Sequence, residues 1–185
     1  MIRYLSTLPL SPDASFLDVG TGNGHLLLEL READLGYSGP MVGIDYSPAS
    51  VKLAKTIAEQ REQEVRFEVV DVIKDDLTGA DWVPQGGFDV VLDKGTFDAI
   101  SLSGEALADG RRVVEAYPAK VAAAMKKGGW LVVTSCNWTE EELARRIVAG
   151  ADGELAIHGR VKYPSFTFGG VKGQTVCTLC FRRKE

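Results

Sequence analysis

The chain has 185 residues, of which 45% are hydrophobic and 25% charged, and these proportions are ordinary for a globular protein of one domain. No apolar run approaches the ~18–20 residues of a membrane-spanning helix, and residues 1–15 lack the features of a secretory signal. The net charge of −5 disfavours sequence-independent binding of nucleic acid, which needs a basic surface. Three cysteines, too few for a disulfide scaffold, favour a reducing, cytoplasmic compartment.

Runs rich in β-branched and aromatic residues alternate with stretches that carry apolar residues at helical spacing. In chain order, the predicted elements are a strand at 14–19, a helix at 24–32, strands at 40–45, 65–70, 88–92 and 130–136 separated by helices at 49–63 and 111–127, a helix at 140–149, and strands at 154–163 and 175–182.

The ends of several predicted helices carry recognisable stop and start signals. Ser47 and Pro48 suit a helix N-terminus, Thr139 is a further N-cap, and Gly128 with Gly129 predicts a helix end after Lys127. Five strands alternating with helices, followed by a strand pair, predict an α/β fold. We expect a Rossmann-like, doubly wound, seven-stranded and mostly parallel sheet with an antiparallel terminal pair, forming one domain over residues 1–185.

A glycine-rich turn, Asp18-Val19-Gly20-Thr21-Gly22-Asn23-Gly24, follows the first predicted strand and precedes the first predicted helix. Glycines at this place let the chain turn tightly and let a ligand approach the backbone. The spacing differs from a dinucleotide fingerprint, because His25 stands where the third glycine belongs. A carboxylate just before the glycines suits an amino group or a cation better than a pyrophosphate.

Three further aspartates, Asp45, Asp71 and Asp93, stand at the ends of the second, third and fourth predicted strands. In an open α/β sheet the carboxyl edge of the strands is where ligands bind. An acidic residue about 20 positions beyond the glycine turn accepts hydrogen bonds from ribose hydroxyls, which assigns that part to Asp45. The four aspartates together predict a ligand site at this edge.

The order of these motifs resembles the S-adenosylmethionine-dependent methyltransferases of the seven-strand class. More narrowly, the sequence is similar to the eukaryotic protein-lysine methyltransferases that modify translation elongation factor 1-alpha. The strings that carry this second resemblance are GIDYSP at 43–48, DKGTFDAISL at 93–102, SCNWT at 135–139 and FTFGG at 166–170. The resemblance implies S-adenosylmethionine as cofactor and elongation factor 1-alpha as protein partner, and we expect a monomer.

The resemblance also implies a role for each cofactor-binding residue. The methionine part lies against Gly20, Gly22 and Gly24, and Asp18 holds its amino group. Asp45 binds the ribose hydroxyls, with Tyr46 against the adenosine. Asp71 receives the adenine amino group, and the backbone of Val72 meets the ring.

Asp93 is expected to contact the cofactor as well as the acceptor. On the acceptor side it is the residue expected to orient the lysine amine, because it ends the strand beside the methyl group. Asn137 and Trp138 follow the fifth strand and are expected to line the lysine channel, where an aromatic face tolerates a cation. Phe97 and Phe168 are further candidates for this channel, although aromatic residues near a sheet are more often part of the core.

Other readings stay open at this point. A small-molecule methyltransferase would have the same cofactor-binding residues and a different acceptor site. A non-catalytic domain that binds S-adenosylmethionine would also have these cofactor-binding residues. An NAD oxidoreductase is disfavoured by Asp18 and His25. Cys177 and Cys180 have zinc-like spacing, but they lie in a predicted strand without a second ligand pair. Members of the family carry a longer N-terminal segment over the cofactor, which we expect this chain to lack.

Overall fold

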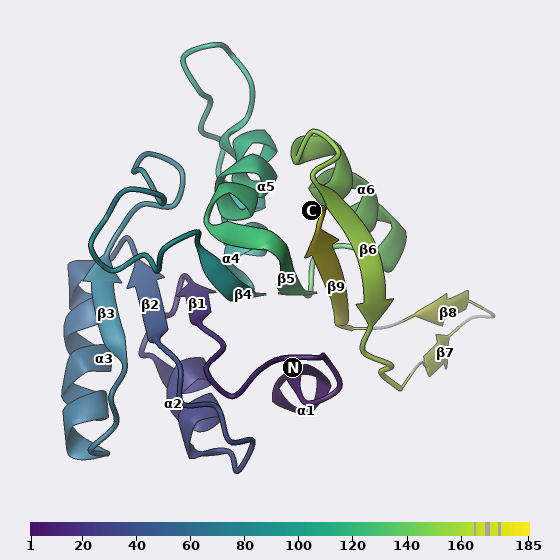
Figure 1. Ribbon diagram of the computed structural model, residues 1–185. Helices are drawn as coiled ribbons and strands as arrows, with labels where there is room; N and C mark the ends of the chain where they lie inside the picture. Colours follow the sequence, from purple (N-terminus) through teal and green to yellow (C-terminus); the bar gives the residue numbers. More distant parts are fainter. Residues whose placement is uncertain (165, 169–170, 174) are drawn as a thin grey trace.

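The computed structural model describes residues 1–164, 166–168, 171–173 and 175–185, and these form a layered α/β fold (Figure 1). Its main sheet has seven strands in the order β3-β2-β1-β4-β5-β9-β6, and β7 pairs with β8 in a separate two-stranded sheet. The strands are β1 (Phe16–Val19), β2 (Met41–Asp45), β3 (Arg66–Val69), β4 (Phe88–Lys94), β5 (Met125–Ser135), β6 (Leu155–Arg160), β7 (Phe166–Phe168), β8 (Val171–Gly173) and β9 (Cys177–Arg183).

The pairing within the main sheet confirms the predicted fold class. Strand β1 is the middle one of five parallel strands: it pairs with β2 and β4, and these pair with β3 and β5, respectively. Strand β9 inserts between β5 and β6 and runs antiparallel to both. Because β1 to β5 are parallel, their carboxyl ends meet at one edge of the sheet, which is where this fold binds ligands.

Helices cover both faces of the sheet, which gives three layers (Figure 1). Helices α1 (Ile2–Leu5), α2 (His25–Glu32) and α3 (Pro48–Gln60) bury apolar residues in one cluster, while α4 (Thr96–Leu102), α5 (Val113–Ala123) and α6 (Glu140–Gly150) contribute to a second cluster on the opposite face. Within the described residues, no helix combines the length and apolar character needed to cross a membrane.

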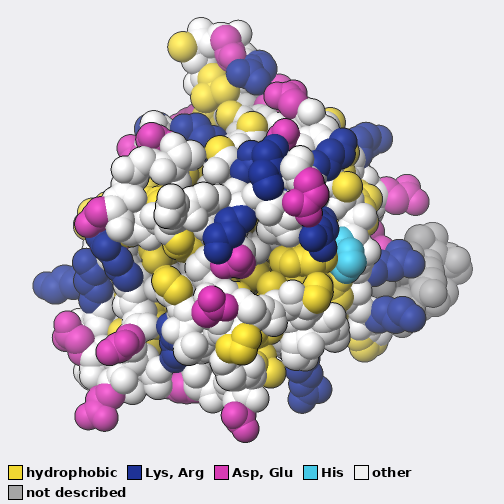
Figure 2. Space-filling model, in the orientation of Figure 1, with side chains coloured by type: hydrophobic (Ala, Val, Ile, Leu, Met, Phe, Trp, Pro, Cys, Tyr) yellow, Lys and Arg dark blue, Asp and Glu magenta, His cyan; other side chains and the backbone are white. Residues whose placement is uncertain are grey.

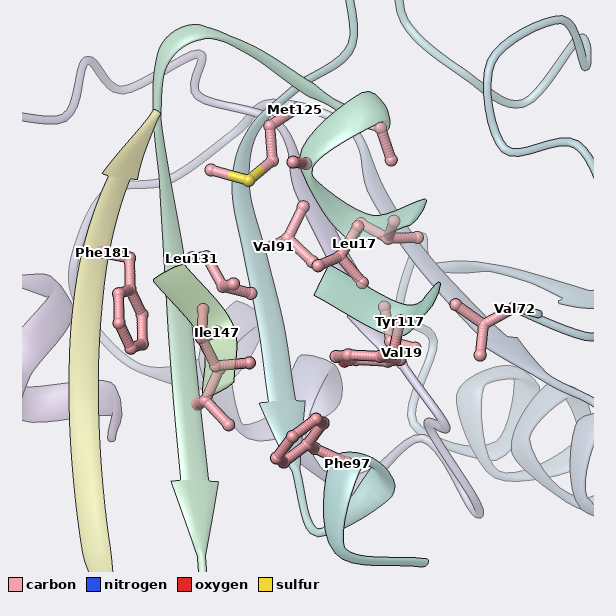
Figure 3. Close-up of a cluster of buried hydrophobic side chains, with 14 of the residues drawn as sticks. Leu17, Val19, Val72, Val91, Phe97, Tyr117, Met125, Leu131, Ile147 and Phe181 are labelled. Carbon is pink, nitrogen blue, oxygen red and sulfur yellow. The ribbon is translucent and has the colours of Figure 1, made fainter. Parts of the chain in front are cut away.

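The second cluster supports the site, because it packs α4 and α5 onto β1 and β4. Tyr117 of α5 and Phe97 of α4 are almost completely buried, and their ring centroids lie 5.4 Å apart. Figure 3 shows Ile147 of α6 on the same face, with Val91 and Leu131 of the strands beneath the helices. Burying a large apolar side chain contributes about 1.5–3 kcal/mol, so this layer holds α4 and α5 firmly on the sheet.

Two of the predicted helix starts are confirmed in detail. The hydroxyl of Ser47 accepts a hydrogen bond from the Ser50 amide at 3.3 Å, with Pro48 in the first turn of α3. Thr139 and Glu142 form a reciprocal capping box at the start of α6, with the Glu142 amide donating to the Thr139 hydroxyl at 3.3 Å. Both caps hold helices that begin just after the carboxyl edge of the sheet.

The predicted helix over residues 111–127 is too long at its C-terminal end. Helix α5 stops at Ala123, and β5 already begins at Met125, which pairs with Phe88 of β4. The sheet captures this segment through the hydrogen bond from the Phe88 amide to the Ala124 carbonyl at 2.8 Å. The two glycines at 128–129 therefore mark an irregular stretch inside the strand, where Gly128 has a φ of 70°, and they do not end a helix.

The short helices α1 and α4 were not predicted, and neither was the β7–β8 pair inside the long loop between the last two strands. Helix α4 has only seven residues. Its N-cap residue is Gly95, which has no side chain to cap the helix. Its sequence therefore lacks the length and the local signals from which helices are recognised.

The glycine turn gives a direct test of this packing. A Cβ at Gly24 would lie 2.6 Å from Cζ of the buried Phe67 ring, whereas a Cβ at Gly22 would meet nothing within 4 Å. Both glycines have left-handed backbone angles, with φ of 79° and 57°. We expect Gly24→Ala to lower the free energy of unfolding by about 1–3 kcal/mol more than Gly22→Ala, because only the former overpacks the core. Urea unfolding of both variants measures this difference, and equal losses would contradict it.

Candidate active site

A cavity of about 520 Å³ opens at the carboxyl edge of the parallel strands. It is bounded by the residues that follow β1, β2, β3 and β4 and by the first half of α4. Its apolar lining comes from Val19, Ile44, Val70, Val72, Ile73, Ala99, Ile100 and Val113, and its charged lining from Asp45, Asp71, Lys74, Lys94 and Glu105. An apolar cleft of this size with few converging polar groups is typical of a site for a small organic ligand.

Of the three glycines in the turn, Gly20 is the one that lines the cavity. A Cβ at Gly20 would lie 2.0 Å from the hydroxyl oxygen of Thr96, which donates a hydrogen bond to the Val19 carbonyl at 2.7 Å. Gly20 therefore lets α4 approach the end of β1. Gly22 and Gly24 do not line the cavity; the Gly22 amide donates to Asp45, and Gly24 makes room for Phe67.

Asp45 ends β2 and lies at the cavity wall with 8% of its surface exposed. One carboxylate oxygen accepts the Gly22 amide at 2.9 Å, and the other accepts the Ser47 amide at 2.9 Å. Each carboxylate oxygen has a second lone pair, so both oxygens of Asp45 can still accept a hydrogen bond from a hydroxyl group of a ligand. Tyr46 follows at the mouth of the cavity, with 78% of its surface exposed.

Asp71 and Val72 follow β3 and line the far side of the cavity. The Asp71 carboxylate accepts the Ile73 amide at 2.9 Å and lies 3.1 Å from the Lys74 ammonium. Burial acts to raise the pKa of Asp71, but its hydrogen bonds with Ile73 and Lys74 outweigh that effect and lower it. A carboxylate that stays ionised in this way can accept a hydrogen bond from an amino group of a ligand.

Asp18 lies beneath the glycine turn, with only 3% of its surface exposed. Burial raises the pKa of Asp18 to about 7, and the nearby carboxylates of Asp93 and Asp45 act in the same direction, whereas the Lys94 ammonium opposes them. A cation that reached Asp18 would restore its ionised form.

Asp93 is fully buried at the end of β4. Its carboxylate accepts the backbone amides of Thr96 at 2.8 Å and Phe97 at 2.9 Å, together with the hydroxyl of Tyr117. Burial raises the pKa of Asp93 to about 6, although these three hydrogen bonds oppose the rise. From its sequence position Asp93 is expected to orient a substrate amine, but in the structure both of its oxygens point into the protein, where they hold the start of α4.

Asn137 and Trp138 lie on the loop that follows β5, at the same edge of the sheet. Asn137 is exposed, whereas Trp138 is half-buried. The Arg146 guanidinium lies 4.0 Å from the centre of the Trp138 ring, and the Phe97 ring packs against Trp138 at 6.3 Å between centroids. The aromatic face expected to receive a substrate cation therefore already contacts an arginine. The side chain of Phe168 lies outside the described residues.

The loop after β5 is fixed by a buried side chain on α4 that the sequence analysis did not single out. Asp98 is 8% exposed and accepts the Ser135 hydroxyl at 2.6 Å and the Cys136 amide at 2.8 Å. The Ser135 hydroxyl oxygen in turn accepts the Asn137 amide at 3.1 Å. Asp98 and Ser135 both belong to the motif strings, but their pairing spans 37 positions, so no local pattern indicates it.

Cys177 and Cys180 do not form a metal site with each other. Cys177 packs into the core layer of α4 to α6, and Cys180 packs into the layer of α1 to α3 on the other face of β9. Within the described residues, no group of three metal-binding side chains lies together.

The parallel sheet, the glycine turn after its first strand and the acidic residue after its second strand define the class of S-adenosylmethionine-dependent methyltransferases. Residues 10–170 match the family described as methyltransferase domain. The chain is 44% identical to protein-lysine N-methyltransferase EFM4 of Saccharomyces cerevisiae, over all of this chain and 77% of the relative. It is 35% identical to EEF1A lysine methyltransferase 2 of Homo sapiens, over 99% of this chain and 71% of that protein. The chain belongs to this family of protein-lysine methyltransferases.

Solved structures agree on the fold. The chain superposes on magnesium protoporphyrin IX methyltransferase from Synechocystis, determined with bound S-adenosylmethionine, with a TM-score of 0.67 at 16% identity, over 99% of this chain and 76% of that one. The PH0226 protein from Pyrococcus horikoshii gives a TM-score of 0.69 at 15% identity, over 98% and 87% of the two chains.

The residues of the cavity fit the cofactor of this class. The apolar walls around Val72 suit an adenine ring, and Asp45 has two free lone pairs for a pair of adjacent ribose hydroxyls. Asp18 lies at the glycine turn, on the side where the amino-acid end of the cofactor would lie.

The raised pKa of Asp18 predicts a pH-dependent stability. Because the folded protein keeps a proton that the unfolded chain loses above pH ~4, stability falls as pH rises from about 4 to 7. Asp18→Asn removes this contribution, so we expect it to raise Tm relative to wild type by roughly several degrees more at pH 8 than at pH 5. Part of the slope remains in the variant, because burial also raises the pKa of Asp93.

Differential scanning calorimetry of the ligand-free protein measures both values. Asp34→Asn, the same change at an exposed position, is the matched control. A difference between Asp18→Asn and wild type that stays constant with pH would contradict the assignment.

Proposed function

We propose that this chain transfers a methyl group from S-adenosylmethionine to a lysine side chain of translation elongation factor 1-alpha. The observation that carries this proposal is the similarity over the full chain to relatives named for that reaction, on a cavity that fits the cofactor. Two of the strings that carry the narrower resemblance contribute to the cavity, at residues 44–46 and 94–100. A third string, residues 135–139, is tied to the second by the hydrogen bond from Ser135 to Asp98.

In this proposal the cofactor is held by three strand ends. Asp45 binds the ribose hydroxyls, Tyr46 covers the adenosine at the mouth, and Asp71 receives the adenine amino group beside Val72. Gly20 lies closest to the methionine part, and Asp18 attracts its amino group from beneath the turn. Gly22 and Gly24 act less directly, by holding Asp45 and by packing on Phe67.

The cofactor supplies an electrophilic methyl group on a positively charged sulfur. The acceptor amine must be neutral to attack, and for a lysine with a pKa near ~10.4 deprotonation at pH 7 costs about 4–5 kcal/mol. Partial desolvation and a nearby positive charge both lower that pKa. The remaining task of the protein is alignment of donor and acceptor, which can supply a large part of the rate enhancement.

We assign the alignment to α4, which lines the cavity, and to the loop after β5, which Asp98 ties to α4. Asn137 is exposed on that loop and is the candidate to contact the incoming lysine. Trp138 shapes the loop from below, between Phe97 and Arg146. Asp93 acts as a positioning residue, because its carboxylate fixes the turn from β4 into α4.

The proposal includes a monomer that works in the cytoplasm, without nucleic-acid or membrane partners. Figure 2 shows acidic and basic side chains interspersed on the face it presents, which is unlike the continuous basic surface of a nucleic-acid binder. The three free cysteines Cys136, Cys177 and Cys180 suit a reducing compartment.

The sequence alone also allows a small-molecule methyltransferase and a non-catalytic domain that binds S-adenosylmethionine. The first is distinguished by its acceptor and the second by binding without transfer. Intact mass of recombinant, unmodified elongation factor 1-alpha, measured after incubation with the chain and the cofactor, separates both. We expect the mass of one or more methyl groups on a single lysine-containing peptide. A chain that binds the cofactor but leaves the mass unchanged would contradict the proposed function.

Asp45 provides the sharpest test of cofactor binding. Hydrogen bonds to a charged group contribute about 1.5–3 kcal/mol each, so losing two of them in Asp45→Ala should weaken the binding of S-adenosylhomocysteine by at least about 100-fold. Isothermal titration calorimetry measures the change. Glu59→Ala removes the same charge from the exposed face of α3 and should leave affinity unchanged. Comparable affinity in the two variants would remove Asp45 from the site.

Asp93 is expected to act on turnover. The variant Asp93→Asn keeps the volume and one acceptor oxygen, so we expect kcat to fall by at least about tenfold through misplacement of α4, and S-adenosylhomocysteine affinity to fall much less than in Asp45→Ala. A loss of cofactor affinity as large as that of Asp45→Ala would refute this division of roles.

A further inference from the structure

We propose that Lys94 binds the carboxylate of the methionine part of S-adenosylmethionine, so that Asp18 and Lys94 together recognise the amino-acid end of the cofactor. This inference rests on the cofactor assignment above and deepens it. It gives a function to a cationic side chain at the cavity that the roles described so far leave unused.

The sheet register places the two side chains on the same face. Asp18 of β1 lies opposite Leu92 of β4 in a parallel pair, and side chains on a strand alternate between faces. Lys94 is two residues beyond Leu92 and therefore lies on the same face as Leu92 and Asp18. Leu92 belongs to the core layer of α2, whose N-terminus follows the glycine turn.

The electrostatics of Asp18 agree with this placement. Burial raises the pKa of Asp18, a hydrogen bond with Thr21 opposes the rise most strongly, and the charge of Lys94 also acts against it. Asp18 lies beneath the turn and Lys94 lines the open cavity. An acidic and a basic side chain thus lie on the same face at the ends of neighbouring strands, and Lys94 lines the cavity together with Gly20.

The charges of the ligand match this pair. The amino-acid end of S-adenosylmethionine carries an ammonium and a carboxylate on the same carbon. This carboxylate is the one negative charge of the cofactor. An unpaired carboxylate in a partly desolvated cleft is costly, so a cation must accompany it. Asp18 suits the ammonium and Lys94 suits the carboxylate.

The cavity is lined by a second lysine, but it is committed elsewhere. The ammonium of Lys74 lies 3.1 Å from the Asp71 carboxylate, on the side of β3 where the adenine is expected. Among the side chains that the structure describes, Lys94 forms no ion pair within 4.0 Å. Its position at the mouth, on the end of β4, leaves its ammonium available to a ligand.

The test compares two ligands that differ only in the carboxylate: S-adenosylmethionine and its decarboxylated form. Isothermal titration calorimetry is carried out on the wild type, on Lys94→Met and on the matched control Lys74→Met. A charge-assisted hydrogen bond of this kind corresponds to about 10- to 100-fold in affinity. We expect wild type and Lys74→Met to prefer the carboxylated ligand by that factor, and Lys94→Met to bind both ligands with nearly equal affinity.

Lys94→Met must lose affinity for S-adenosylmethionine and keep its affinity for the decarboxylated form. A merely structural role of Lys94 would not produce this difference. If Lys94→Met keeps the wild-type preference, or weakens both ligands equally, the inference is wrong while the cofactor assignment stands. If Lys74→Met loses the preference instead, the carboxylate belongs to Lys74. If the wild type binds neither ligand, the cofactor assignment fails as well.

Discussion

The carboxylate of Asp93 joins three elements at one buried point, and the shape of the site depends on it. It accepts two amides from the start of α4 and the hydroxyl of Tyr117 on α5, all from its place at the end of β4. Removing one partner from such a network leaves buried polar groups without hydrogen bonds, which costs about 1–3 kcal/mol each. The wall that α4 contributes to the cavity is therefore fixed relative to the strand ends that bind the ligand.

The four aspartates at the strand ends divide into two kinds. Asp18 and Asp93 are buried, and their raised pKa values reflect the cost of holding a charge away from water. Asp45 and Asp71 line the cavity and keep oxygens available at its surface. The inner pair shapes the site and sets its electrostatics, and the outer pair offers hydrogen bonds to the ligand. A positive ligand compensates the inner pair, which suits a cofactor that carries a sulfonium and an ammonium.

Much of this was predictable because the signals are local. Strand β1, the glycine turn and α2 follow one another within a few residues, and Ser47 and Thr139 cap helices beside them. The parts that sequence reasoning missed depend on distant partners. The start of β5 is set by pairing with Phe88, and the inward orientation of Asp93 is set by Tyr117, which lies 24 positions away. The Asp98 network crosses from α4 to the loop after β5, so its role emerges only from the packed structure.

The most direct test is a crystal structure of the protein with S-adenosylhomocysteine. The account predicts the adenosine in the cavity at the strand ends, with both ribose hydroxyls on the Asp45 carboxylate and the ring beside Val72. It also predicts the amino-acid end above Gly20, between Asp18 and Lys94. Electron density for the ligand at any other surface, or a ribose that makes no contact with Asp45, would contradict it.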